Sequence, residues 1–378
     1  MSKINEATAM IPINMAASTY AAFERVTEQY PDIDQYVCDK LGYDSKEKLG
    51  SLFSAEQIDA LALAIFSHEE LGRSMINADQ TGLGKGRFMA GLIRYCAIQG
   101  MTPVFLTYKP SLLSDIFRDV ADIESLDLFK NVFTVNNVKI TDFYDTNKPL
   151  FKAMKAAEHK KIIQDGELPE NTDLVLATYS QFSQRLSRSA KAQFLEKIAA
   201  KDKTFFLLDE SHIAAGESNI HTNIAAALDV SSGAVFSSAT ALKNTKSFKL
   251  YKSIFPPSIN PDTLPEIFRV GGESLQEAVS NCLAADGVLI CRQHDLSDLE
   301  IRTIDPDEEF IQRNREISDK VAEILTMMST LSGDVKSRTV KMNDDFQADY
   351  DALPESVKQS GSGRMQASSM NFGSRLYA

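Results

Sequence analysis

The stretch that decides the fold of this chain is ADQTGLGKGR, residues 78–87. Residues 74–78, just before it, look like a short strand, and residues 88–96 have the apolar spacing of an amphipathic helix. Glycines let backbone N–H groups turn toward an anion, a helix start adds positive potential, and a lysine can reach the β- and γ-phosphates. This order of strand, glycine loop, lysine and helix predicts a phosphate-binding loop for a nucleoside triphosphate.

The loop departs from the standard pattern at two positions. Asp79 stands where the first glycine is usual, and Gly86 stands where Ser or Thr normally holds Mg²⁺. A glycine-rich turn ahead of a helix also forms for plain backbone reasons. That alternative stays open for the loop taken alone, and the segments downstream decide between the two interpretations.

Length and composition narrow the class of protein. The chain has 378 residues and a net charge of −12, which allows one large or two modest domains. An acidic chain must meet a nucleic acid through a local basic patch rather than through its overall field. The cysteines show no Cys-x-x-Cys spacing, so neither a zinc knuckle nor a disulfide framework is indicated; they are Cys38, Cys96, Cys282 and Cys291. Reduced thiols and an N-terminus that does not resemble a signal peptide favour a cytoplasmic location. No apolar run is long enough for a membrane helix, so we expect no membrane partner.

Short apolar runs alternate with helix-like segments from residue 74 onward. The candidate strands are residues 75–76, 103–106, 174–177, 205–208 and 234–237, and the candidate helices are residues 84–98, 111–120, 150–163 and 187–200. Nearly continuous apolar strands separated by helices are typical of a parallel sheet covered on both faces. We therefore expect a doubly wound, mostly parallel α/β fold.

The segments outside this core divide the chain further. We expect an N-terminal helical region over residues 1–72, the α/β lobe over 73–256 and the end of that lobe over 257–304, with a helix at 273–286 and an apolar run at 287–291. The last part, residues 305–378, is expected to be a helical and loosely ordered extension: one long helix over 308–331, then a polar tail beyond 333.

Two acidic residues follow the apolar strand at residues 205–208. In a parallel sheet, ligands lie at the carboxyl ends of the strands, so Asp209 and Glu210 are expected beside the phosphate loop. Asp209 can hold Mg²⁺, and Glu210 can orient or deprotonate an attacking water. The alternative is a simple helix N-cap. Ser211 and His212 cannot complete a hydrolytic triad with Asp209, because triad groups converge from different elements.

The next apolar strand ends in Ser237-Ser238-Ala239-Thr240. Small polar residues end many strands, so this signal says little alone. As the next strand end after Asp209 and Glu210, it completes an ordered set of three motifs.

That order of motifs resembles the superfamily-two helicases and translocases. The loop DQTGLGK, residues 79–85, is similar to the version in chromatin-remodelling ATPases, and the continuation Gly86-Arg87 resembles the strawberry notch group, where glycine takes the usual Ser/Thr place. The nearest likeness is to strawberry notch-type helicase domains of large phage anti-restriction (DarB-like) proteins, over most of residues 10–300.

The resemblance implies a RecA-like ATPase lobe that uses ATP and Mg²⁺. Gln57 would read the adenine, while Ser238 and Thr240 would couple the nucleotide state to movement. Lys85, Asp209 and Glu210 would be catalytic, with Asp209 serving the metal. The residues that would hold the phosphates are Thr81, Gly82, Leu83, Gly84, Lys85, Gly86 and Arg87.

The resemblance also implies a nucleic-acid partner, DNA rather than RNA. Tyr108, Lys109, Thr178 and Tyr179 follow strands where such enzymes touch the backbone, and Tyr and Lys suit stacking and phosphate contact. Ordinary polarity at strand ends is the alternative for these four residues. An anti-restriction role, and a place in the host cytoplasm or the virion, follow only from the likeness to phage proteins.

Such motors have two lobes, and the second supplies arginines to the transition state. After Thr240 the sequence shows neither a second strand–helix series nor an arginine motif of the Gln-x-x-Gly-Arg-x-x-Arg kind. We therefore expect slow hydrolysis unless a second lobe or a partner chain completes the site. One rival hypothesis is a non-catalytic structural or virion-associated module that keeps the fold. The other is a P-loop kinase or small-molecule NTPase.

Overall fold

The computed structural model describes residues 1–351 except 186, 188, 202, 217, 241–249, 261, 262, 298, 301 and 303–305. The chain divides into two compact units, residues 1–298 and residues 299–378. The first unit contains every strand of the described residues and the helices around them, and the second contains the helix α11 (Glu308–Asp351).

A seven-stranded sheet forms the centre of the first unit, in the order β10-β2-β9-β8-β3-β7-β4. Every neighbouring pair in it is parallel. Its strands are β2 (Met75–Asn77), β3 (Thr102–Thr107), β4 (Val132–Thr134), β7 (Leu174–Thr178), β8 (Thr204–Asp209), β9 (Gly233–Ser237) and β10 (Leu289–Ile290). The parallel sheet confirms the predicted doubly wound α/β class.

Alternation along the strands explains why helices cover both faces. On β8, Phe205 and Leu207 belong to one apolar cluster, whereas Phe206 and Leu208 belong to a second cluster on the other face. Successive strand residues point to opposite faces, so a strand that is apolar throughout must be covered on both sides. The first cluster includes residues of helices α1 to α6, and the second includes residues of α7 to α10.

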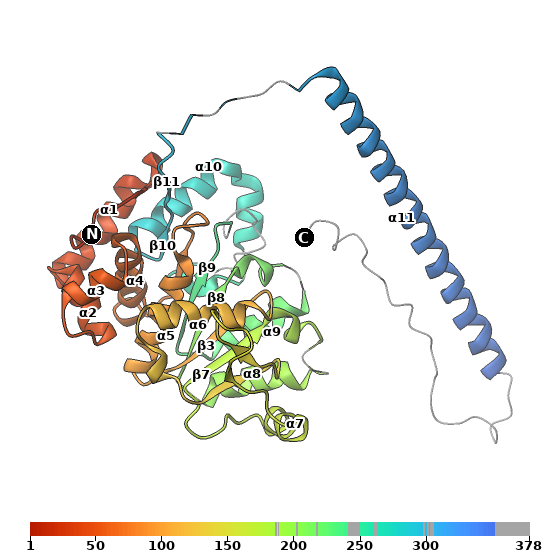
Figure 1. Cartoon of the computed structure of the whole chain (residues 1–378), viewed down its shortest axis with the longest axis horizontal. Coiled ribbons are helices and arrows are strands. Elements are labelled where there is room, and N and C mark those ends of the chain that lie inside the picture. The colour runs from red at the N-terminus through yellow and green to blue at the C-terminus, as the bar shows by residue number, and fades with distance from the viewer. Residues whose placement is uncertain are drawn as a thin grey trace. The chain divides into compact units, whose positions relative to one another are not determined.

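In chain order, the helices of the first unit precede the strands of the seven-stranded sheet or lie between them. They are α1 (Ile13–Gln29), α2 (Ile33–Leu41), α3 (Lys46–Leu52), α4 (Ala55–Glu69), α5 (Lys85–Ile98), α6 (Leu112–Asp122), α7 (Ala156–Asp165), α8 (Ala190–Lys201), α9 (Asn219–Asp229) and α10 (Leu264–Ala285). Short 3-10 helices lie at η1 (Leu126–Leu128), η2 (Tyr179–Phe182), η4 (Ser211–Ile213) and η6 (Lys252–Ile254). In Figure 1 the N-terminal helices α1 to α4 lie against the body of the first unit, and α4 contacts both β2 and α5.

Two small antiparallel pairs complete the first unit. β1 (Ala9–Met10) pairs with β11 (Gln293–His294), and β5 (Ile140–Thr141) pairs with β6 (Pro149–Phe151). The single helix predicted over residues 150–163 was wrong at its start: residues 149–151 form β6, and α7 begins at Ala156. The apolar ring of Phe151 packs on Phe117, with the centroids 5.2 Å apart, so a tertiary contact holds this segment extended.

The C-terminal part of the chain also differs from the prediction. The helix α10 begins at Leu264, earlier than predicted, and it bends at Gly272, whose φ is 61°. The helix α11 continues beyond residue 333, where a polar tail was expected, and reaches Asp351. Charged and polar residues predominate there, and such residues are compatible with an exposed helix. Residues 352–378, the rest of the expected tail, lie outside the described residues.

No single helix among the described residues combines the length and apolarity needed to cross a membrane, although the bent pair α3 and α4 reaches that composition jointly.

Candidate nucleotide-binding site

The loop between β2 and α5 has the form of an anion cradle. Gly82 and Gly84 adopt positive φ angles of 96° and 77°, a conformation that side chains with a Cβ rarely adopt. Gly84 is the N-cap of α5, and no side chain caps it. The first N–H groups of a helix have no partner within the helix. The start of α5 therefore presents free donors and positive potential beside an exposed Thr81 and Gly82.

Lys85 is the first residue of α5 and folds back over this loop. Its Nζ donates to the backbone carbonyl of Asp79 at 2.8 Å. A bound phosphate would offer Nζ a charged acceptor in place of a neutral one, and charge-assisted bonds are the stronger kind. The lysine thus lies where the sequence predicted it, within reach of the loop interior.

A buried ion pair anchors the start of the loop. Asp79 and Arg292 are 1% and 2% exposed, and Arg292 Nη2 lies 2.5 Å from Asp79 Oδ2. The carbonyl of Arg292 also accepts the N–H of Gln80 at 2.9 Å. Two residues further on, Nε2 of His294 contacts the carbonyl of Thr81 at 2.9 Å. Asp79, the departure from the first glycine, therefore ties the loop to the segment after β10.

Asp209 lies at the carboxyl end of β8, where the sequence placed it. Thr107, at the end of the neighbouring β3, donates to its Oδ2 at 3.0 Å. Burial raises the pKa of Asp209, and the Glu210 charge adds to this, whereas the hydrogen bond from Thr107 and the charge of Lys85 oppose it. Lys85 starts α5 directly after β2, and Asp209 ends β8, so both residues lie at carboxyl ends of strands of the same parallel sheet.

A polar chain connects the ends of β8 and β9. Nδ1 of His212 lies 3.3 Å from Oε2 of Glu210 and 2.9 Å from Oγ of Ser238. Oγ of Ser238 in turn accepts the N–H of Thr240 at 3.2 Å. Glu210 has a positive φ of 48°, a strained conformation that often marks functional sites. The structure thus brings together Glu210, Ser238 and Thr240 through His212.

Gln57 reaches the loop from α4. Its Oε1 accepts the N–H of Ser54 at 3.0 Å, which completes a capping box at the start of α4. Its Nε2 lies 3.4 Å from the carbonyl of Gly84. The side chain therefore lies against the predicted phosphate loop, and its role toward an adenine stays a prediction.

Arg87 and Gly86 differ in what they offer a phosphate. The Arg87 guanidinium pairs with Asp122 of α6 at 2.7 Å, so its side chain is engaged away from the loop. Gly86 contributes only backbone, and Leu83 is half-buried beside it. A phosphate contact by the Arg87 side chain would have to replace the Asp122 pair.

The residues expected to touch nucleic acid separate into two groups. Tyr108 is 52% exposed, and Nζ of Lys109 lies 5.5 Å from its ring centroid. Thr178 and Tyr179, by contrast, are 0% and 1% exposed. The Tyr179 hydroxyl donates to the carbonyl of Asp209 at 2.7 Å. Thr178 and Tyr179 therefore have no surface for a nucleic acid in this structure, and Tyr179 instead supports the carboxyl end of β8.

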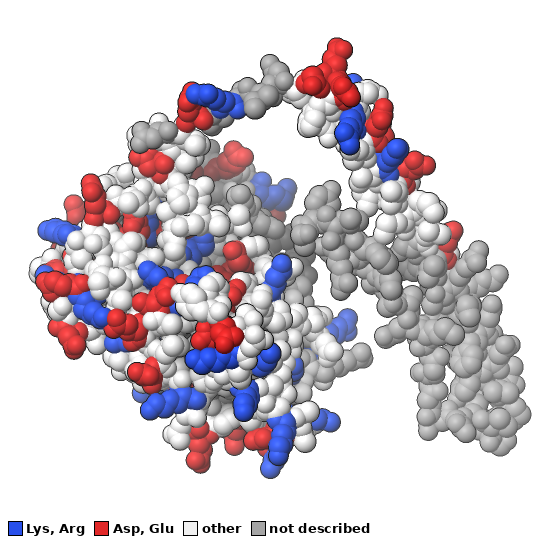
Figure 2. Space-filling view, viewed as in Figure 1, with Lys and Arg blue, Asp and Glu red and all other residues white. Residues whose placement is uncertain are grey.

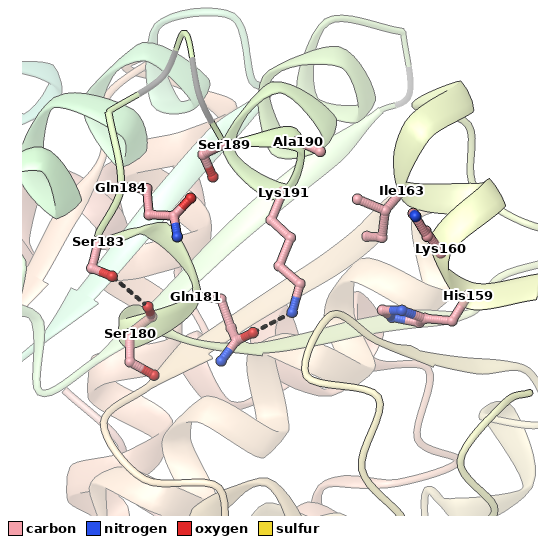
Figure 3. A pocket seen from close by; sticks show the side chains of 10 residues that line it. All are labelled: His159, Lys160, Ile163, Ser180, Gln181, Ser183, Gln184, Ser189, Ala190 and Lys191. Atoms are coloured by element: carbon pink, nitrogen blue, oxygen red, sulfur yellow. Dashed lines mark hydrogen bonds between the residues drawn. The ribbon is translucent and has the colours of Figure 1, made fainter. Parts of the chain in front are cut away.

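A polar pocket of about 520 Å³ lies beside η2, the 3-10 helix that follows β7, and Figure 3 shows the side chains that line it. None of these lining residues belongs to the phosphate loop. Residues of η2, α7 and α8 line it, among them Lys160, Ser180 and Lys191. Burial lowers the pKa of Lys191, and its ammonium donates to Gln181. Two lysines and no acidic residue are among the described residues that line the pocket, so it is a local cationic feature. Over the face drawn in Figure 2, by contrast, acidic and basic side chains are interspersed.

Sequence reasoning missed three supporting residues. Thr107, Arg292 and His294 contact Asp79, Thr81 or Asp209 from other strands. Thr107 carried a weak signal, because it ends a strand next to β8. Arg292 carried only a weak family likeness in the pair Arg292-Gln293, and His294 carried no signal, because only the folded chain brings these residues against the loop.

A model of the family described as P-loop containing NTP hydrolase pore-1 matches residues 29–315. The match covers more than half of the chain, and the chain belongs to this family. Its fold is accordingly that of a P-loop NTPase lobe, and a nucleotide is the ligand that this class of site binds.

Among solved structures, the chain is similar to the Sulfolobus solfataricus SWI2/SNF2 ATPase core in complex with dsDNA. The identity is 13% and the TM-score 0.41, with 63% of this chain and 44% of that chain covered. The chain thus spans less than half the length of that relative. The search of curated proteins gave no match.

Proposed function

We propose that this chain is the ATP-binding and ATP-hydrolysing lobe of a helicase-like nucleic-acid translocase. The observation that carries the proposal is the polar chain from Glu210 through His212 to Ser238 and Thr240. It links the predicted water-orienting carboxylate to a second strand end. An NTPase that only hydrolyses nucleotide has no need of such a link, whereas a motor must transmit the state of its nucleotide.

The residues of the site suit the roles that the sequence assigned. Lys85 and the start of α5 would hold the phosphates, and Gln57 lies against the loop for an adenine. Glu210, 39% exposed at its side chain, would orient the water and take its proton. Asp209 is a half-buried carboxylate at the end of β8, and it would hold Mg²⁺, which when bound neutralises charge on the phosphates.

The residues proposed to contact a nucleic acid are Tyr108, Lys109 and the lysines of the polar pocket. Tyr108 and Lys109 follow β3, and the pocket with Lys160 and Lys191 follows the neighbouring strand β7. The carboxyl ends of parallel strands lie at one edge of a sheet, so a strand of nucleic acid could meet both. DNA rather than RNA, a phage type and an anti-restriction role rest on the sequence resemblance alone.

The alternative is a non-catalytic structural or virion-associated module that retains the fold. Two observations favour it: the net charge of −12, which repels nucleic acid, and the lack of a side-chain oxygen at Gly86. Against it stands the presence of Lys85, Asp209 and Glu210 together, since a site without turnover need not keep all three.

ATP turnover with and without double-stranded DNA tests the proposal. We expect turnover that DNA stimulates and that falls by about a hundredfold or more in Lys85→Ala and Glu210→Gln, since each removes transition-state stabilisation. The matched controls are the exposed pair-forming residues Lys148→Ala and Glu266→Gln. If nucleotide binds but turnover equals that of the two variants, the chain is the non-catalytic module; turnover indifferent to DNA would contradict the motor.

A further inference from the structure

Gly86 leaves the site without the side-chain oxygen that Ser or Thr usually gives to Mg²⁺. It is the second residue of α5, directly after Lys85. The volume that a hydroxyl side chain would take is already filled. A Cβ built on Gly86 would overlap Oδ2 of Asp119 and lie 3.3 Å from its Cγ.

Asp119 comes from α6, the helix that packs on α5. Its side chain is 13% exposed, so the carboxylate is largely buried at the start of α5. Burying a charge without a strong partner is costly. The neighbouring carboxylate of Asp122 pairs with Arg87 at 2.7 Å. Among the described contacts, Asp119 has only the adjacent Arg118, whose Nη2 lies 3.3 and 3.5 Å from its two oxygens, long for a charge-assisted bond.

We propose that Asp119 replaces the missing hydroxyl and supplies, directly or through a water, an oxygen ligand for the Mg²⁺ that accompanies the nucleotide. The proposal rests on the proposed function of the loop as a nucleotide site. Magnesium prefers oxygen ligands and is usually bound by one or two protein carboxylates plus substrate phosphates. In this proposal Asp119, beside Gly86, would be one such carboxylate, and Asp209 at the end of β8 would be the other.

The simpler role for Asp119 is to stabilise the positive end of the α5 dipole. That role is independent of metal. An ordinary phosphate loop places no second carboxylate at this position, and a permanent negative charge there would weaken binding of a bare triphosphate. A metal ligand and a dipole partner therefore differ in how nucleotide affinity responds to Mg²⁺.

The test is the affinity for a fluorescent ATP analogue, measured with Mg²⁺ and with EDTA, for wild type, Asp119→Asn and the control Asp115→Asn. Asp115 is one turn earlier on α6. We expect Asp119→Asn to lose about tenfold or more in affinity with Mg²⁺, by comparison with losses at outer-shell metal sites, and to lose nothing in EDTA. Mn²⁺ binding followed by electron paramagnetic resonance should weaken in the same variant and not in the control.

A swap keeps the test decisive if Asp119→Asn is unstable. Gly86→Ser alone should bind poorly, because the new Cβ meets the Asp119 carboxylate, whereas Gly86→Ser combined with Asp119→Ala should regain much of the Mg²⁺ dependence. Equal losses with Mg²⁺ and with EDTA, or unchanged Mn²⁺ binding, would overturn the role of Asp119 and leave the nucleotide site standing. Failure of the wild type to bind the analogue under either condition would instead refute the proposed function.

Discussion

At the scale of single residues, buried charge organises this site. The pair of Asp79 and Arg292 replaces a glycine of the usual loop with a buried acid and its counter-ion. Arg292 Nη1 has no hydrogen-bond partner among the described residues. The pair therefore acts as an anchor that holds the loop against the segment following β10, rather than as an optimised network.

We predict that Arg292→Ala strongly destabilises the first unit. Removing one partner leaves Asp79 charged, buried and unpaired, which costs roughly 3–5 kcal/mol of unfolding free energy. Urea unfolding measures this. The double variant Asp79→Gly, Arg292→Met removes both charges and should recover much of the loss; a double variant as unstable as Arg292→Ala alone would show that the pair is not the source of the effect.

At the scale of elements, the first turn of α4 both caps its own helix and contacts the loop before α5. Its capping box joins Ser54 and Gln57, and Gln57 also reaches the carbonyl of Gly84. The start of this helix is thus tied to the start of α5. A change at Ser54 should alter the helix cap alone, whereas a change at Gln57 alters both the cap and the loop contact.

We predict that Ser54→Ala costs about 1 kcal/mol of stability, the usual value for a lost N-cap, and leaves nucleotide affinity unchanged. Gln57→Ala should show a similar loss of stability and, in addition, weaker nucleotide binding. Thermal unfolding and titration with the fluorescent nucleotide give the two quantities. Equal nucleotide affinity in both variants would remove Gln57 from the binding site.

At the scale of the whole molecule, residues 1–298 form a unit with its own core. Among the described residues, no member of either buried cluster, and no residue packed against one, comes after Cys291 in the sequence. The apolar side chains of α11 include Phe310 and Ile317, which are 58% and 51% exposed. Neither residue is among the members of the two buried clusters.

We predict that a chain ending at residue 298 folds and binds nucleotide with the affinity of the full chain. Its thermal midpoint should lie within about 2 °C of the full-length value, because a change of 1 kcal/mol shifts the midpoint of a 150–250-residue domain by only about 2–4 °C. Calorimetry gives the midpoint. A truncated chain that aggregates or loses nucleotide affinity would show that residues beyond 298 belong to the same folding unit.

The features that the sequence predicts are those that depend on residues close together in the chain. The glycine loop, the apolar strands and Asp209 at a strand end depend on local spacing, and the parallel sheet then brings the strand ends to one edge. The sequence did not predict the strand β4 or the hairpin of β5 and β6, because tertiary contacts rather than periodicity hold such short segments in place.

The tertiary structure alone decided which polar groups face the site. It buried Thr178 and Tyr179, paired Asp79 with Arg292, and put Asp119 in the side-chain volume missing at Gly86. Each of these depends on residues far apart in sequence that meet only when helices and strands pack. Periodicity reports the face on which a residue lies, but not the partner that it meets there, and for charged groups the partner determines the chemistry.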